Sequence, residues 1–140
     1  MMAVGSTLPW WVAQQDSAAL REIARRSDSA AHSARSQVEK NVATYNSQAA
    51  QAYLALLRHD TTTALRRLEA LPDSLCPLCY SQHLTLVQLL SARHEDQKAA
   101  RLLNRGLVDL MLPSEVLWTL ERARVAERLG VELETELEIW

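Results

Sequence analysis

Residues 46–72, NSQAAQAYLALLRHDTTTALRRLEALP, decide the fold of this chain. Before His59 the apolar residues recur every three or four positions, a spacing that places them on one face of a helix. They are Ala49, Ala52, Tyr53, Leu56 and Leu57. After Asp60 the same spacing returns in Ala64, Leu65, Leu68 and Leu71. We therefore predict two helices that fold back on each other across His59 and Asp60.

The second of these helices has clear start and stop signals. Asp60 is placed to cap it, because a carboxylate at that position accepts hydrogen bonds from the free N–H groups of the first turn. Pro72 cannot continue the helix and ends it. Neither apolar face can be buried by this hairpin alone, which is the usual condition of a repeat unit.

The same turn recurs along the chain. His59, His94 and Gly130 each separate two helical segments, and they stand 35 and 36 residues apart. Gln15 has the same place in a first unit, 44 residues before His59. After two of the turns a small residue stands four positions before a bulky one, in Ala64 with Leu68 and Ala99 with Leu103. This spacing lets the second helix approach the first closely, and about four degenerate hairpins are predicted.

At these residues the chain resembles the tetratricopeptide repeat (TPR), which has a period of about 34 residues. Ala64, Leu68 and Pro72 match its small–bulky pair and closing proline, while its first-helix Trp and Gly are missing. The resemblance covers about residues 9–140. The phrases ARVAERLG and ALRRLEALPDS are similar to repeat regions C-terminal to bacterial serine/threonine kinases or transcriptional activators. The resemblance implies an all-α, right-handed superhelical stack of antiparallel helix hairpins, a TPR-like α-solenoid.

The resemblance also implies a function. We expect a non-catalytic adaptor that binds a peptide or protein segment on the concave face formed by the first helix of each hairpin. Its groove-facing residues would be Asn46, Tyr53, Gln88, Arg124 and Arg128. No catalytic residue carries over, so an enzyme is not expected. The alternative is a regulatory or sensor segment detached from a larger bacterial signalling protein, either a kinase or a transcriptional activator.

The expected organisation is a flexible leader over residues 1–7 and one repeat domain over residues 8–140. A short helix is predicted over 8–15, and Asp16 opens a second one that ends in the Ser-rich segment 27–36. Longer helices follow over about 37–58 and 77–93, and Ser114 is placed to cap the last long one. The apolar stripe of helix 37–58 is Val38, Val42, Tyr45, Ala49 and Ala52, and that of the last is Trp118, Leu120, Ala123, Ala126 and Leu129.

Composition limits the possible partners. The net charge of −2 argues against bulk affinity for nucleic acid or anionic lipid. No apolar run reaches the roughly 20 residues of a membrane span, and no basic segment marks a signal peptide. We therefore expect a cytoplasmic protein without a cofactor. Its arginines are expected to face solvent and to pair with Glu69, Glu95, Glu121 or Glu127.

Cys76-Pro77-Leu78-Cys79 is the one motif that could carry chemistry. With Pro77 at a helix start, Cys79 would lie in the first turn, where the helix dipole lowers a thiol pKa. A metal site would add His83 as a third ligand and still need a fourth. We favour two structural, buried cysteines, and metal and redox roles stay open as alternatives.

The two ends of the predicted stack both carry tryptophans. Trp10 and Trp11 are neighbours on a short helix, where adjacent side chains point about 100° apart, so they cannot both face inward. An exposed apolar end tends to find a partner. We therefore expect either a homo-oligomer formed through the terminal helices or a piece of a longer parent.

Overall fold

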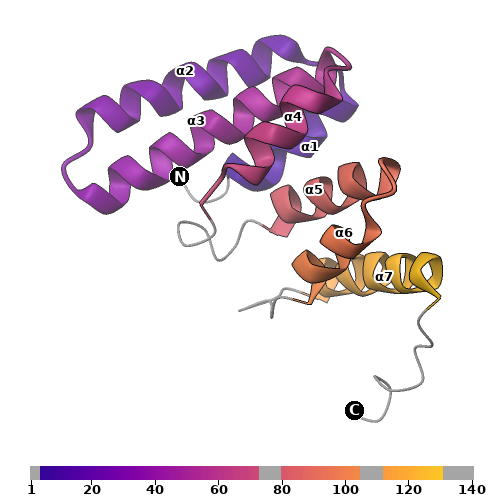
Figure 1. Cartoon of the computed structure of the whole chain (residues 1–140). Coiled ribbons are helices and arrows are strands. Elements are labelled where there is room, and N and C mark those ends of the chain that lie inside the picture. The colour runs from indigo at the N-terminus through magenta and orange to yellow at the C-terminus, as the bar shows by residue number, and fades with distance from the viewer. Residues whose placement is uncertain (1–3, 73–79, 105–111, 131–140) are drawn as a thin grey trace. The chain divides into compact units, whose positions relative to one another are not determined.

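The computed structural model describes residues 4–72, 80–104 and 112–130, and the side chains of 7–72, 81–104 and 116–130. Within these ranges the regular structure consists of seven α-helices, and no strand occurs there (Figure 1). The all-α class predicted from the sequence is therefore confirmed. The chain divides into two compact units, Met1–Gln82 and His83–Trp140.

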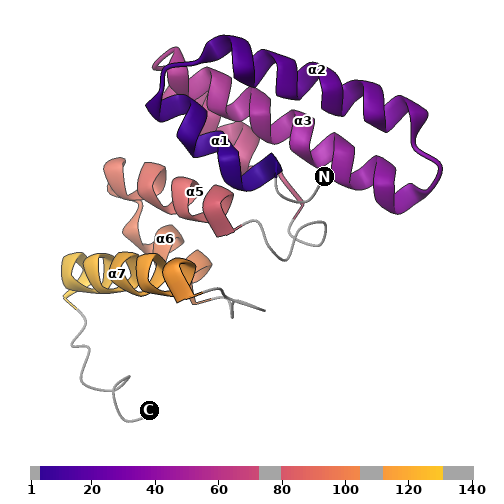
Figure 2. The same ribbon diagram turned by 180° about the vertical axis from the view of Figure 1, so that it is seen from behind.

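The long helix α3 organises the first unit. The unit contains α1 (Val4–Ala13), α2 (Ser17–Ser33), α3 (Gln37–Leu57) and α4 (Thr61–Glu69). Helix α3 packs against each of the other three (Figures 1 and 2). Most of its buried residues are small: Ala43, Ser47, Ala49, Ala50, Ala52 and Ala55. These side chains let three neighbouring helices approach one backbone closely.

The boundaries of α1 and α2 differ from the prediction. Helix α1 begins at Val4, so residues 4–7 are helical and Pro9 lies inside the helix. Helix α2 continues to Ser33 through the Ser-rich segment that was expected to be a connection. Within that segment Ser27 is buried, and Ser33 Oγ donates to the Ser29 carbonyl at 3.0 Å.

Helices α2 and α3 have 17 and 21 residues, whereas α4 has nine. The ends of α2 and α3 next to the loop that joins them therefore extend past α1 and α4, and among the described helices they lie only against each other (Figure 1). Val38 belongs to this overhang and is 71% exposed. Its predicted place on the buried stripe was wrong, because no third helix of the described ranges covers α3 at that end. Tyr45, Ala49 and Ala52 are buried as predicted.

The second unit contains most of α5 (Tyr80–Ala92), together with α6 (Asp96–Leu103) and α7 (Leu112–Leu129). Its core is Leu86, Val87, Leu90, Ala99, Leu103, Trp118 and Val125. Trp118 Nε1 donates to the Leu103 carbonyl at 3.0 Å, which ties α7 to the end of α6.

Two predictions about α7 were wrong. The helix begins at Leu112, so Ser114 lies inside its first turn and is not the cap. Pro113 is tolerated there because the first N–H groups of a helix have no partner within it. Leu120 and Leu129 are 48% and 37% exposed, since the buried stripe runs through Trp118, Glu121 and Val125.

The helix–helix turns have one repeated geometry. Gln15, His59, His94 and Gly130 have φ of 54°, 60°, 60° and 66°, in the left-handed region. Within each of the first three turns the next residue donates its N–H to a carbonyl five residues back at 2.9 Å, as from Asp60 to Ala55. The left-handed residue itself donates to a carbonyl three residues back. This pair of bonds is the Schellman motif, and it confirms that Gln15, His59 and His94 are equivalent; Gly130 shares their φ and the second of the two bonds.

The residue after each of the first three left-handed positions directly precedes the next helix. Asp16 Oδ1 accepts from Ala19 N at 2.8 Å, and Asp60 Oδ1 accepts from Thr63 N at 3.0 Å. Glu95 has the equivalent position, but its side chain makes no capping hydrogen bond. Its carboxylate accepts a hydrogen bond from Lys98 Nζ instead. The capping role predicted for Asp60 is therefore confirmed.

Candidate functional site

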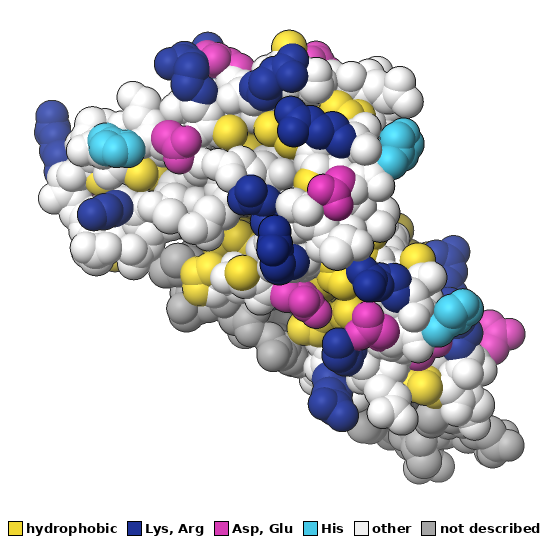
Figure 3. Space-filling model, turned by 45° about the horizontal axis from the view of Figure 1, so that its top comes forward, with side chains coloured by type: hydrophobic (Ala, Val, Ile, Leu, Met, Phe, Trp, Pro, Cys, Tyr) yellow, Lys and Arg dark blue, Asp and Glu magenta, His cyan; other side chains and the backbone are white. Residues whose placement is uncertain are grey.

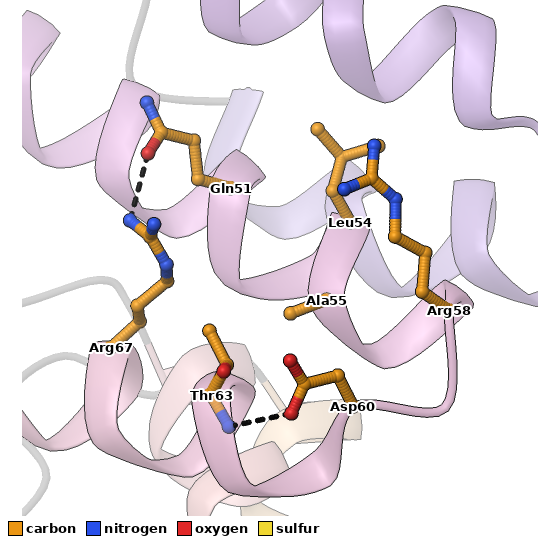
Figure 4. Close-up of a pocket in the computed structure, with 7 residues that line it drawn as sticks. All are labelled: Gln51, Leu54, Ala55, Arg58, Asp60, Thr63 and Arg67. Atoms are coloured by element: carbon orange, nitrogen blue, oxygen red, sulfur yellow. Dashed lines mark hydrogen bonds between the residues drawn. The ribbon is translucent and has the colours of Figure 1, made fainter.

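A hollow of about 230 Å³ lies on the surface of the α3–α4 hairpin. Its lining is Gln51, Leu54, Ala55, Arg58, Asp60, Thr63 and Arg67 (Figure 4). The α3 residues stand at positions i, i+3, i+4 and i+7, and the α4 residues stand four apart. Both spacings gather side chains on one helix face. The hairpin turn, which contributes Asp60, brings the two faces together.

Two guanidinium groups lie on opposite sides of this hollow, with Ala55 between them (Figure 4). Arg67 Nη1 donates to Gln51 Oε1 at 2.8 Å, which links α4 to α3. The Arg58 side chain has no hydrogen-bond or ion-pair partner among the residues that the structure describes. Two arginines and one aspartate give the lining one net positive charge. Basic and hydrophobic side chains also lie interspersed on the molecular face drawn in Figure 3.

Asp60 closes the lower edge of the hollow. Its pKa is held below the ordinary value because Thr63 donates two hydrogen bonds to the carboxylate. The bond from the Thr63 side chain is the larger cause, and the bond from the Thr63 backbone N–H is the next. The charge of Arg66 acts in the same direction. The carboxylate is therefore ionised at neutral pH, and its charge is offset by the α4 N-terminus that it caps.

The residues predicted to line a concave groove fall into two sets. Asn46 and Tyr53 belong to the first unit and are only 4% and 1% exposed. The Tyr53 hydroxyl donates to the Ser81 carbonyl at 3.3 Å. These two side chains therefore serve packing and are not available to a ligand from the surface.

Gln88, Arg124 and Arg128 belong to the second unit, and all three are exposed. Gln88 and Arg124 meet at one carboxylate oxygen of Glu121, at 3.4 and 2.7 Å. Glu121 itself is buried, 6% exposed. The sequence indicates this pair through the spacing of three residues between Glu121 and Arg124.

The other arginines depart in part from the predicted pairing. Arg128 bonds Asp96 Oδ1 and Ser91 Oγ, both at 2.8 Å. Arg67 bonds Gln51, which is not one of the four glutamates predicted as partners. Glu95 pairs with Lys98 and Arg93, and these cations lower its pKa, with the Lys98 hydrogen bond as the largest cause.

The metal and redox alternatives rest on residues that are largely undescribed. Cys76 and Cys79 lie outside the described residues, and His83 is half-buried. No group of three or more potential metal-ligating side chains gathers within residues 4–72, 80–104 and 112–130. In the same ranges no helix is long and apolar enough to cross a membrane.

The hollow was not predicted from the sequence. The signal that could have located it is the set Gln51, Leu54, Ala55 and Arg58, a mixed polar and apolar face on the helix of the opening stretch. The structure thus defines an all-α protein of helical hairpins with a basic hollow on one of them. No protein-family model, curated protein or solved structure matches the chain.

Proposed function

We propose that this chain is a non-catalytic protein-interaction module whose ligand is a peptide or protein segment. The proposed architecture is a TPR-like, right-handed stack of its hairpins, and the proposed compartment is the cytoplasm. The repeated Schellman turns at Gln15, His59 and His94 support the repeat architecture. In such arrays hairpins stack into an extended surface suited to holding a chain segment.

One observation carries the binding role: the hollow on the α3–α4 hairpin. It combines an apolar floor at Leu54 and Ala55 with hydrogen-bonding groups at its rim, the composition that peptide and ligand sites share. It is formed by two helices whose local geometry is fixed by a capped, three-residue turn. A site on such a scaffold is preorganised, which lowers the entropic cost of binding.

Selection from a random peptide display library tests this proposal. Enriched peptides are synthesised, and their affinities are measured by fluorescence anisotropy for the wild type and two variants. Leu54→Trp fills the hollow with a larger side chain. Lys40→Trp places the same side chain on an exposed part of α3, about 21 Å along the helix, and is the matched control.

We expect enriched peptides to bind the wild type and Lys40→Trp equally and to lose affinity for Leu54→Trp. Circular dichroism checks that both variants keep the wild-type helicity. Failure to enrich any peptide, or equal binding to Leu54→Trp, would refute the proposal.

A further inference from the structure

We infer that the α3–α4 hollow is specific for an acidic segment of a partner protein, in which a carboxylate side chain stands beside an apolar one. This inference rests on the proposed function and names the chemistry of its ligand. Arg58 and Arg67 bind the carboxylate, and Leu54 and Ala55 receive the apolar neighbour.

The two arginines supply the donors. A guanidinium group has five N–H donors in a planar fork that matches a carboxylate. Arg67 uses one nitrogen for Gln51, and Arg58 uses none on any described residue. The hollow therefore holds unused cationic donors on two sides (Figure 4). Charge-assisted bonds of this kind are about twice as strong as neutral ones.

Asp60 is the one group of the lining that would repel an anion. Its carboxylate is already engaged, because Oδ1 accepts from Thr63 N and the capped helix end offsets its charge. It also lies at the edge of the hollow beside Thr63, whereas Arg58 and Arg67 lie on the two sides (Figure 4). Asp60 therefore restricts where the incoming carboxylate lies, and it leaves the two arginines as the available partners.

The apolar floor of the hollow favours binding of a peptide over binding of a simple anion. Leu54 is half-buried and Ala55 is 8% exposed, so apolar surface lies between the two guanidinium groups. Covering this surface favours a ligand that carries an apolar side chain next to its charge. The net charge of −2 disfavours a polyanion such as nucleic acid, which needs an extended basic surface. An acidic, partly apolar peptide satisfies both requirements.

The test uses a fluorescent decapeptide in which glutamate and leucine alternate. Matched peptides replace every glutamate with glutamine or with lysine. The protein variants are Arg58→Gln, Arg67→Gln and the double substitution, which remove charge with little change in side-chain length. Arg66→Gln is the control, because Arg66 is exposed on the same helix, precedes Arg67 directly and does not line the hollow.

We expect the glutamate peptide to bind the wild type and the glutamine and lysine peptides to bind at least about tenfold more weakly. The double variant should lose affinity for the glutamate peptide by about tenfold or more, and Arg66→Gln should keep the wild-type affinity. Raising the salt concentration should weaken the wild-type complex, because the contacts are exposed.

Equal binding of the glutamate and glutamine peptides, or unchanged binding by the double variant, would overturn the inference. Peptides from the display selection that need Leu54 but show no acidic preference would overturn it and leave the proposed function intact.

A second copy of the chain is the other source of such a segment, since Glu132, Glu134, Glu136 and Glu138 alternate with mostly apolar residues. Light scattering distinguishes the two sources. We expect any dependence of the mass on concentration to be the same in the wild type, in the double variant and in a chain ending at Gly130. Self-association that is lost both in the double variant and in a chain ending at Gly130 would overturn the assignment to a partner protein.

Discussion

Replacing His59 with glycine should stabilise the protein. His59 has φ of 60°, and a side chain in the left-handed region costs roughly 1–2 kcal/mol because Cβ approaches the following carbonyl. Glycine removes this cost but gains freedom in the unfolded chain, which returns about 0.4–1 kcal/mol. The His59 side chain is exposed, so its removal loses little packing. The net expectation is a gain of about 0.5–1 kcal/mol.

Two further variants test whether the left-handed backbone conformation causes the change in stability. His94 has the same φ of 60° and is also exposed, so His94→Gly should give a similar gain. Gly130 has φ of 66°, and a Cβ built there meets nothing within 4 Å. Gly130→Ala should therefore destabilise by about the amount that His59→Gly gains, through backbone conformation alone.

Urea unfolding followed by circular dichroism at 222 nm measures these changes. With a slope of about 1–3 kcal/mol per molar urea, the midpoint should rise by a few tenths of a molar for each glycine. It should fall by a similar amount for Gly130→Ala. An unchanged or lower midpoint for His59→Gly, with Gly130→Ala destabilising as expected, would refute the claim that the histidine is strained.

Three further predictions concern packing, charge and assembly. Ala64 and Ala99 are 0% exposed, so Ala64→Leu or Ala99→Leu should overpack its hairpin and cost about 1–3 kcal/mol in thermal melts; the exposed Ala70→Leu is the control. The pKa of Glu22 is lowered from 4.5 to about 2, chiefly by hydrogen bonds from Arg25 and Arg26. Its contribution to stability is therefore complete above pH 4.5 and lost as the pH falls toward 2, and carboxyl NMR titration should show the midpoint rising in Arg25→Gln/Arg26→Gln. Trp10 is 61% exposed, and exposed apolar side chains tend to find a partner. If the protein self-associates through α1, Trp10→Ser should lower the mass measured by light scattering to that of a monomer. A monomeric wild type would contradict self-association through α1.

Features set by adjacent residues could be predicted from the sequence. The hairpin boundary at His59 follows from hydrophobic spacing and from Asp60, which is placed to cap, and the boundary at His94 follows from the spacing alone. Both depend on residues within one or two helix turns. The structure gives α3 and α4 as Gln37–Leu57 and Thr61–Glu69, within a residue or two of the predicted bounds. The equivalence of His59 and His94 could be predicted because the turns at His59, His94 and Gly130 are spaced almost equally.

Features that depend on neighbouring helices could not be predicted in the same way. Val38 and Leu120 fit apolar stripes, yet both are exposed because no described helix covers them. The groove residues Asn46 and Tyr53 were selected by resemblance, and their burial depends on what packs around α3. The hollow was missed since it needs Arg58 and Arg67, nine positions apart, to be brought together by the turn.

Because of the overhang of α2 and α3, the free energy of local opening differs along the first unit. Near residues 34–36 each of the two helices is covered, within the part of the chain that the structure describes, only by the other, and the side chains from Arg35 to Lys40 are exposed. Segments with few buried apolar contacts open at low free energy, independently of the rest of a domain. Amide hydrogens at this end should therefore exchange with solvent well before those around Ala49 to Tyr53. The overhang can then separate and close again while the α3–α4 turn stays folded.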